Sequence, residues 1–198
     1  MFDFLGLLLP KRCVFCLKVS AEGLCGDCQG SLPRRTATPP IAPLYYKGAV
    51  RSALHRYKFN GASGYAKVFA KLMAQAITDS GVPADVITWI PCSFFRRWSR
   101  GYDQSEKLAR AVSKCLNIPA QKLLTKKRHA KSQTKMADAL ARLENVRGVF
   151  SARAEVSGKR VLLIDDIFTT GATMEECRQV LLDTGAIDVT GCILAAVK

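Results

Sequence analysis

Short apolar runs alternate along most of this chain with segments whose apolar residues recur at helical spacing. The apolar runs predict strands over 44–50, 86–90, 161–164 and 188–197. The periodic segments predict helices over 64–78, 105–116 and 172–182. Strands that alternate with helices indicate an α/β fold with a parallel sheet and right-handed crossovers. Ligands of such sheets bind beyond the carboxyl ends of the strands, so functional residues are expected there.

Four of the eight cysteines lie near the N-terminus in the pattern Cys13-x₂-Cys16-x₈-Cys25-x₂-Cys28. Two Cys-x₂-Cys knuckles can chelate one tetrahedral Zn²⁺, and we predict a zinc ribbon. An iron–sulfur cluster or a redox pair is the alternative. A module this small depends on its metal to fold. Its role stays open between docking, nucleic-acid binding and a purely structural clip.

A segment rich in proline, arginine and threonine, residues 31–40, has the composition of a linker. It divides the chain into a zinc-binding module with an apolar N-terminal segment, residues 1–38, and a main domain, residues 39–198. The short apolar N-terminus lacks a basic leader, and no apolar run reaches about 18 residues. We therefore expect a cytoplasmic protein without a transmembrane segment, whose thiols stay reduced.

The chain of 198 residues carries a net charge of +14 and has an isoelectric point of about 9.7. Residues 96–160 hold 17 Lys and Arg against 5 Asp and Glu, a net charge of +12. This balance favours anionic partners such as phosphorylated ligands, nucleic acid or a membrane surface. Four aromatic residues near the start of that segment would suit the stacking of single-stranded bases: Phe94, Phe95, Trp98 and Tyr102.

The predicted strand 161–164 is followed by Asp165 and Asp166 and then by a turn rich in threonine and glycine. The residues of that turn are Thr169, Thr170, Gly171, Ala172 and Thr173. Backbone N–H groups at a helix start favour an anion such as phosphate, and the two carboxylates can accept hydrogen bonds from sugar hydroxyls. Phosphate at one end and a diol at the other describe a ribose 5-phosphate. The alternative is an ordinary polar turn between strand and helix.

Two basic segments are candidates for binding a pyrophosphate. The first follows the strand 86–90 and contains Cys92, Ser93, Arg96, Arg97 and Arg100. Arginine forks suit phosphate oxygens, although an exposed basic loop is the alternative. A capping box formed by Asp103 and Glu106 is predicted to begin the helix that follows. In the second segment, residues 126–133, Arg128 and Lys131 could neutralise charge on a leaving group, or could simply be solvated.

The segment VLLIDDIFTTGAT, residues 161–173, resembles the phosphoribosyl pyrophosphate (PRPP) motif of type I phosphoribosyltransferases. The resemblance implies that Asp165 and Asp166 hold the ribose hydroxyls and that residues 169–173 cradle the 5′-phosphate. It also implies that Mg²⁺ binds with PRPP, that the loop after strand 86–90 binds pyrophosphate, and that residues 126–133 form a flexible catalytic loop. For a transfer reaction, it points to four catalytic residues: Asp165, Asp166, Arg128 and Lys131.

Nearly the whole chain resembles the ComF family. The resemblance rests on the four cysteines, ALHRYKFNG at 53–61, RRWSRGYDQS at 96–105, ARLENVRGVF at 141–150 and LLIDDIFTTGAT at 162–173. It implies a Rossmann-like type I phosphoribosyltransferase fold and a role in natural transformation, with single-stranded DNA and a helicase as partners. Two hypotheses follow: a PRPP-binding protein that handles incoming single-stranded DNA, or an active phosphoribosyltransferase with an unidentified base or amine acceptor.

Overall fold

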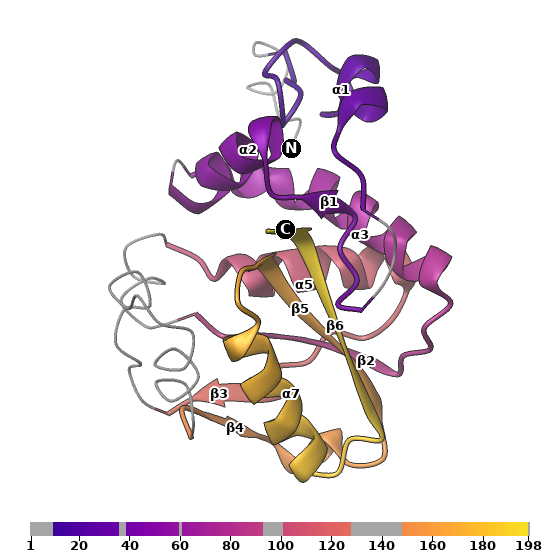
Figure 1. Ribbon diagram of the computed structural model, residues 1–198, viewed down its shortest axis with the longest axis vertical. Helices are drawn as coiled ribbons and strands as arrows, with labels where there is room; N and C mark the ends of the chain where they lie inside the picture. Colours follow the sequence, from indigo (N-terminus) through magenta and orange to yellow (C-terminus); the bar gives the residue numbers. More distant parts are fainter. Residues whose placement is uncertain (1–9, 36–38, 60, 93–100, 128–147, 198) are drawn as a thin grey trace, which may run out of the picture.

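The computed structural model describes residues 10–35, 39–59, 61–92, 101–127 and 148–197. Four parallel strands form its central sheet in the order β1-β6-β5-β2 (Figure 1). Their bounds are β1 Leu44–Tyr45, β2 Val86–Trp89, β5 Arg160–Phe168 and β6 Asp188–Ala196. The α/β class and the parallel sheet predicted from the sequence are therefore confirmed.

The middle of the sheet consists of continuous apolar runs, because helices cover both of its faces. All four residues of β2 are buried, and so are residues 161–164 of β5. Trp89 is in register with Ile164, and Ile164 is in register with Cys192 on β6. The carboxyl end of β2 therefore lies beside Ile164, four residues before β5 ends at Phe168. The loop that follows β2 therefore begins next to Asp165.

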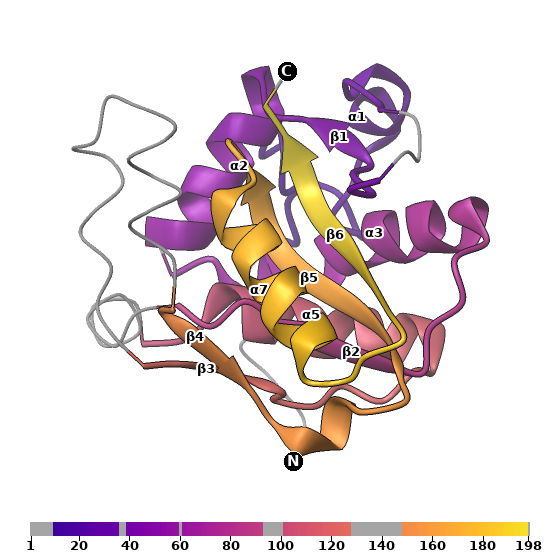
Figure 2. The ribbon, with the colours of Figure 1, turned by 60° about the horizontal axis from the view of Figure 1, so that its bottom comes forward.

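Helices on the two faces of the sheet pack through separate groups of apolar side chains (Figures 1 and 2). The helices α3 Ala66–Ser80 and α5 Gln104–Leu116 cover the face that includes Leu162 and Ile164. The helix α7 Ala172–Asp183 covers the face that includes Val161 and Leu163. The helix α2 Gly48–Phe59 lies beyond the arrowheads of β5 and β6, at the end of the sheet where ligands are expected.

Three features differ from the sequence expectations. The strand predicted over 44–50 is wrong beyond Tyr45, because the chain turns at Gly48, with φ +51°, and begins α2. The strand predicted over 161–164 continues through both aspartates to Phe168. An antiparallel pair was not predicted: β3 Leu124–Lys126 with β4 Phe150–Ala152. It flanks residues 128–147, which lie outside the described part of the chain.

Residues 10–35, here called the cysteine module, pack against α2 and α3 and share their core. Val14 and Phe15 are buried in the same cluster as Leu162 and Ile164. The Phe15 ring lies 5.9 Å from the Phe69 ring on α3, measured between centroids. The module also contains α1 Gly26–Ser31. The domain boundary between residues 38 and 39 stays a prediction, because residues 36–38 are not described.

Hydrogen bonds fix the cysteine module to α2 as well. The Arg56 guanidinium donates from Nη2 to the carbonyl oxygens of Val14, at 2.7 Å, and Phe15, at 3.0 Å. A charged donor such as guanidinium gives stronger hydrogen bonds than a neutral one. The module is therefore held on α2 by polar as well as apolar contacts. None of the helices in the described ranges is long and apolar enough to cross a membrane.

We predict that Phe15→Ala destabilises the whole protein, because the Phe15 side chain is only 2% exposed and belongs to the shared core. Loss of a buried phenylalanine side chain costs about 3–5 kcal/mol. Urea unfolding followed by circular dichroism measures this loss. Val19→Ala is the control, because Val19 lies in the same module but is exposed, and a change below about 0.5 kcal/mol is expected. Equal small losses would contradict a shared core.

Candidate functional site

Two adjacent carboxylates stand near the carboxyl end of β5. The Ser105 hydroxyl donates to Asp165 Oδ1 at 2.8 Å, and the Asp166 backbone N–H donates to the same oxygen at 2.9 Å. Lys58 Nζ lies 2.8 Å from Asp166 Oδ1, and these side chains are only 20% and 10% exposed. These four residues come from three elements, α2, α5 and β5, so the site assembles distant parts of the chain.

The electrostatics of this pair are set by burial. Burial raises the pKa of Asp165 to about 7, and the negative charge of Asp166 acts in the same direction. The ammonium of Lys58 and the hydrogen bonds from Asp166 N–H and Ser105 lower the pKa and limit the rise. A site with two acids and one nearby cation can accept hydrogen bonds from a neutral polyol at modest electrostatic cost.

Lys58 is held in place by the residue that precedes it. The Tyr57 hydroxyl donates to the Gln104 carbonyl oxygen at 2.8 Å, and Tyr102 donates its hydroxyl to the Tyr57 carbonyl oxygen. Burial raises the pKa of Tyr57, so its hydroxyl keeps its proton and remains a donor. These two bonds lock the last turn of α2 onto the start of α5. The ammonium of Lys58 is thereby directed at Asp166.

The turn that follows β5 has the shape expected of a phosphate-binding loop. Gly171 is the residue before α7 and has φ +79°, a conformation that favours glycine. A Cβ atom at this position would lie 2.6 Å from Cζ of Phe168, so any other residue would also require the Phe168 ring to shift. Of the five predicted residues, Thr169 and Thr170 are exposed, Gly171 and Thr173 are half-buried, and Ala172 is buried. The structure thus brings them together at the start of a helix beside the two aspartates.

The other predicted anion pocket is described only at its base. The Cys92 backbone N–H donates to Asp103 Oδ2 at 2.9 Å, while Asp103 Oδ1 accepts from Glu106 N–H at 3.1 Å. The Asp103 side chain thus caps α5 and also bonds to the loop after β2, whereas Glu106 Oε1, predicted to complete a capping box, accepts from Arg110 Nε at 3.0 Å. The remaining predicted residues lie outside the described ranges: Ser93, Arg96, Arg97, Arg100, Arg128 and Lys131. Their roles stay predictions.

Lys58 and Ser105 are the site residues that the sequence analysis did not identify. Both lie in segments singled out by their family resemblance, 53–61 and 96–105. No other sequence signal marked Lys58, because the burial of Tyr57 and the exposure of Phe59 are properties of the folded helix. For Ser105 the signal was its position two residues after the helix cap Asp103.

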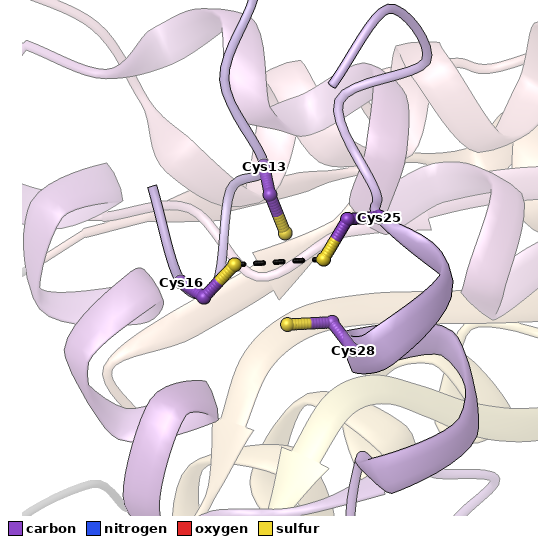
Figure 3. A group of neighbouring side chains, drawn as sticks. All are labelled: Cys13, Cys16, Cys25 and Cys28. Carbon is purple, nitrogen blue, oxygen red and sulfur yellow. Dashed lines mark hydrogen bonds between the residues drawn. The ribbon is translucent and has the colours of Figure 1, made fainter. Parts of the chain in front are cut away.

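The four cysteines of the module converge on one point (Figure 3). Their sulfur atoms all lie within 4.8 Å of one another, and Cys16 Sγ is 3.5 Å from Cys25 Sγ. Burial and neighbouring thiols raise the pKa of Cys28, whereas burial of Cys13 is outweighed by backbone hydrogen bonds that bring its pKa to about 6. Thiols this close cannot all ionise without a cation, and a bound divalent metal ion would supply that charge. The donor set fits a tetrahedral metal site.

The parallel sheet is of the phosphoribosyltransferase type, and residues 103–197 match the family called phosphoribosyl transferase domain. The competence protein ComFC of Streptococcus pneumoniae is 31% identical over 179 residues, which cover 90% of this chain and 78% of the relative. The DNA utilization protein YhgH of Escherichia coli strain K12 is 29% identical over 178 residues, covering 83% and 74%. The chain belongs to the ComF family of competence proteins.

A solved structure also resembles part of the chain. The glutamine PRPP amidotransferase from B. subtilis, complexed with ADP and GMP, is 29% identical over 66% of this chain, with a TM-score of 0.47. The matched region spans 26% of the length of that enzyme.

We predict that Lys58→Met raises the pKa of Asp165 above its value of about 7, because the nearby positive charge that lowers it is removed. Carboxyl ¹³C chemical shifts recorded across a pH titration measure this change. Lys67→Met is the matched control, because Lys67 is an exposed lysine on α3. An Asp165 titration midpoint that is the same in both variants would contradict the arrangement of Lys58 and the two acids.

Proposed function

We propose that this protein binds PRPP at the carboxyl end of β5 and acts in natural transformation. One observation carries the proposal: Asp165 and Asp166 lie near the end of β5, the second of them five residues before the helix cap Gly171, with Lys58 paired to the second carboxylate. A ribose 5-phosphate needs acceptors for two hydroxyls and donors for one phosphate, and this arrangement supplies both.

Each part of PRPP has a proposed contact. The ribose 2′- and 3′-hydroxyls donate to Asp165 and Asp166, and the 5′-phosphate accepts from backbone N–H groups of residues 169–173. The pyrophosphate lies toward the loop after β2, which begins at Cys92 beside β5. Mg²⁺ would offset the charge of the pyrophosphate, since it usually keeps several waters and binds phosphates.

The proposed cellular role rests on the relatives and on charge. The relatives bear the names competence protein ComFC and DNA utilization protein, and the net charge of +14 suits a polyanion. We propose that the protein handles incoming single-stranded DNA together with a helicase partner. A reducing, cytoplasmic location is consistent with four clustered cysteines that serve as metal ligands rather than as disulfides.

We predict that PRPP binds in the presence of Mg²⁺ and that the double variant Asp165→Asn/Asp166→Asn loses at least about ten-fold in affinity. The amides cannot accept two hydroxyl protons as strongly as the carboxylates do, and hydrogen bonds to charged groups contribute about 1.5–3 kcal/mol each. Isothermal titration calorimetry measures the affinity. Asp183→Asn is the control, because Asp183 is exposed at the far end of α7.

Two outcomes would overturn parts of this proposal. Undiminished PRPP binding by the double variant would remove the ligand assignment. Pyrophosphate release from PRPP, on addition of a nucleobase or amine, would instead establish the competing function of an active phosphoribosyltransferase. That assay needs only the wild-type protein, PRPP, Mg²⁺ and a panel of acceptors.

We propose zinc as the metal of the cysteine module, and we predict about one zinc ion per chain by elemental analysis. Cys25→Ser should lose the metal and unfold at a lower temperature, because the ion compensates four clustered thiolates. Cys115→Ser is the control, since Cys115 is an exposed cysteine on α5. Iron with acid-labile sulfide, or full zinc content in Cys25→Ser, would contradict the assignment.

A further inference from the structure

The helix α2 uses its sides for different contacts. Its core side carries Val50, Ala53, Leu54 and Tyr57, all of them buried. Arg56 reaches the cysteine module, and Lys58 reaches Asp166. Next to Lys58, the helix also carries exposed residues that make neither of these two contacts.

A row of three such exposed residues runs along the helix: Arg51, His55 and Phe59. They are spaced four residues apart, so they form one ridge of the helix surface, here called the α2 ridge. The rings of His55 and Phe59 lie 4.8 Å apart between centroids, and Phe59 is 59% exposed. The ridge therefore presents two neighbouring aromatic rings and one guanidinium to solvent.

The α2 ridge runs close to the proposed ligand site. Lys58 follows Arg51 by seven residues, nearly two full turns, so the two side chains leave the helix on the same side. Lys58 is also the residue that contacts Asp166. A molecule lying along the ridge would thus have one flank beside the carboxyl end of β5.

Charge around the ridge favours a polyanion. The helix α2 itself carries Arg51, Arg56 and Lys58 and no Asp or Glu, and Lys58 is paired with Asp166. An exposed phenylalanine in such surroundings suits a ligand that combines phosphates with flat rings. An acidic peptide would use the cations but would leave the aromatic pair unexplained.

We propose that the α2 ridge binds single-stranded DNA, with bases stacked on Phe59 and His55 and phosphates contacted by Arg51. This inference rests on the proposed role in DNA handling and assigns that role to a particular surface. The ridge is about 12 Å long, since eight residues of helix rise by 1.5 Å each. It can hold about four nucleotides at the 3.4 Å spacing of one stacked strand.

The first test separates stacking from charge. Fluorescence anisotropy is measured with a labelled 12-mer of deoxythymidylate and with an abasic 12-mer that keeps the phosphates. Phe59→Ala should weaken binding of the first about ten-fold and leave binding of the second unchanged, because only bases stack. Phe59→Trp should restore binding. Ile187→Ala is the control, because Ile187 is 68% exposed but lies at the opposite end of the sheet, before β6.

The second test concerns the phosphates. Arg51→Ala should weaken both oligonucleotides and reduce the slope of log affinity against log salt by about one. Lys114→Ala, an exposed lysine in the last turn of α5, should leave that slope unchanged. If Arg51→Ala and Lys114→Ala change the salt slope equally, DNA is attracted to the basic protein as a whole, and the assignment of DNA binding to the α2 ridge is overturned.

PRPP binding by the same variants separates this inference from the proposed function. Phe59→Ala and Arg51→Ala should bind PRPP as the wild-type protein does. If both variants bind PRPP normally and their DNA binding is also unchanged, the DNA assignment of the α2 ridge is overturned and the proposed PRPP binding is not. If the wild-type protein does not bind PRPP, the ligand assignment is overturned, whatever the result with DNA.

Discussion

The contact between Lys58 and Asp166 is the interaction on which the rest of this site depends. Two adjacent carboxylates at the end of a buried strand repel each other, and burial adds to that cost. A single ammonium at 2.8 Å offsets part of the repulsion. Removal of one partner from a buried ion pair leaves an uncompensated charge, which is strongly destabilising. The lysine thus allows the acidic pair to exist in the folded protein.

That lysine can act only because α2 is fixed from three directions. Tyr57 bonds to the start of α5, Arg56 bonds to the cysteine module, and the apolar side of α2 enters the shared core. The cysteine module therefore contributes to the position of Lys58 although none of its described residues is among the contacts of the acidic pair. The cysteine module and the acidic pair are therefore connected through a single helix, which gives the module a structural reason to be present.

The sequence predicts the parts of this protein that depend on residues close together along the chain. Apolar runs identified β2, β5 and β6, and Asp103 was identified as a helix cap because its spacing to Glu106 is a local property. The turn after β5 was predicted for the same reason, since Gly171 and its neighbours are consecutive. The acidic pair and the turn that follows it could be placed from one continuous segment.

The sequence predicts much less where distant residues meet. Nothing local indicates that Lys58 would contact an acid 108 positions later, or that Ser105 would donate to Asp165. The expected strand over 44–50 was wrong because a short aromatic and apolar run fits a strand until a glycine with positive φ reverses the chain. Yet that reversal is what starts α2, and α2 supplies the cation. The turn at Gly48, which the sequence did not predict, therefore positions Lys58 beside the two aspartates, which it did predict. For this reason the acidic segment alone indicates a ligand but does not indicate the surface formed by α2.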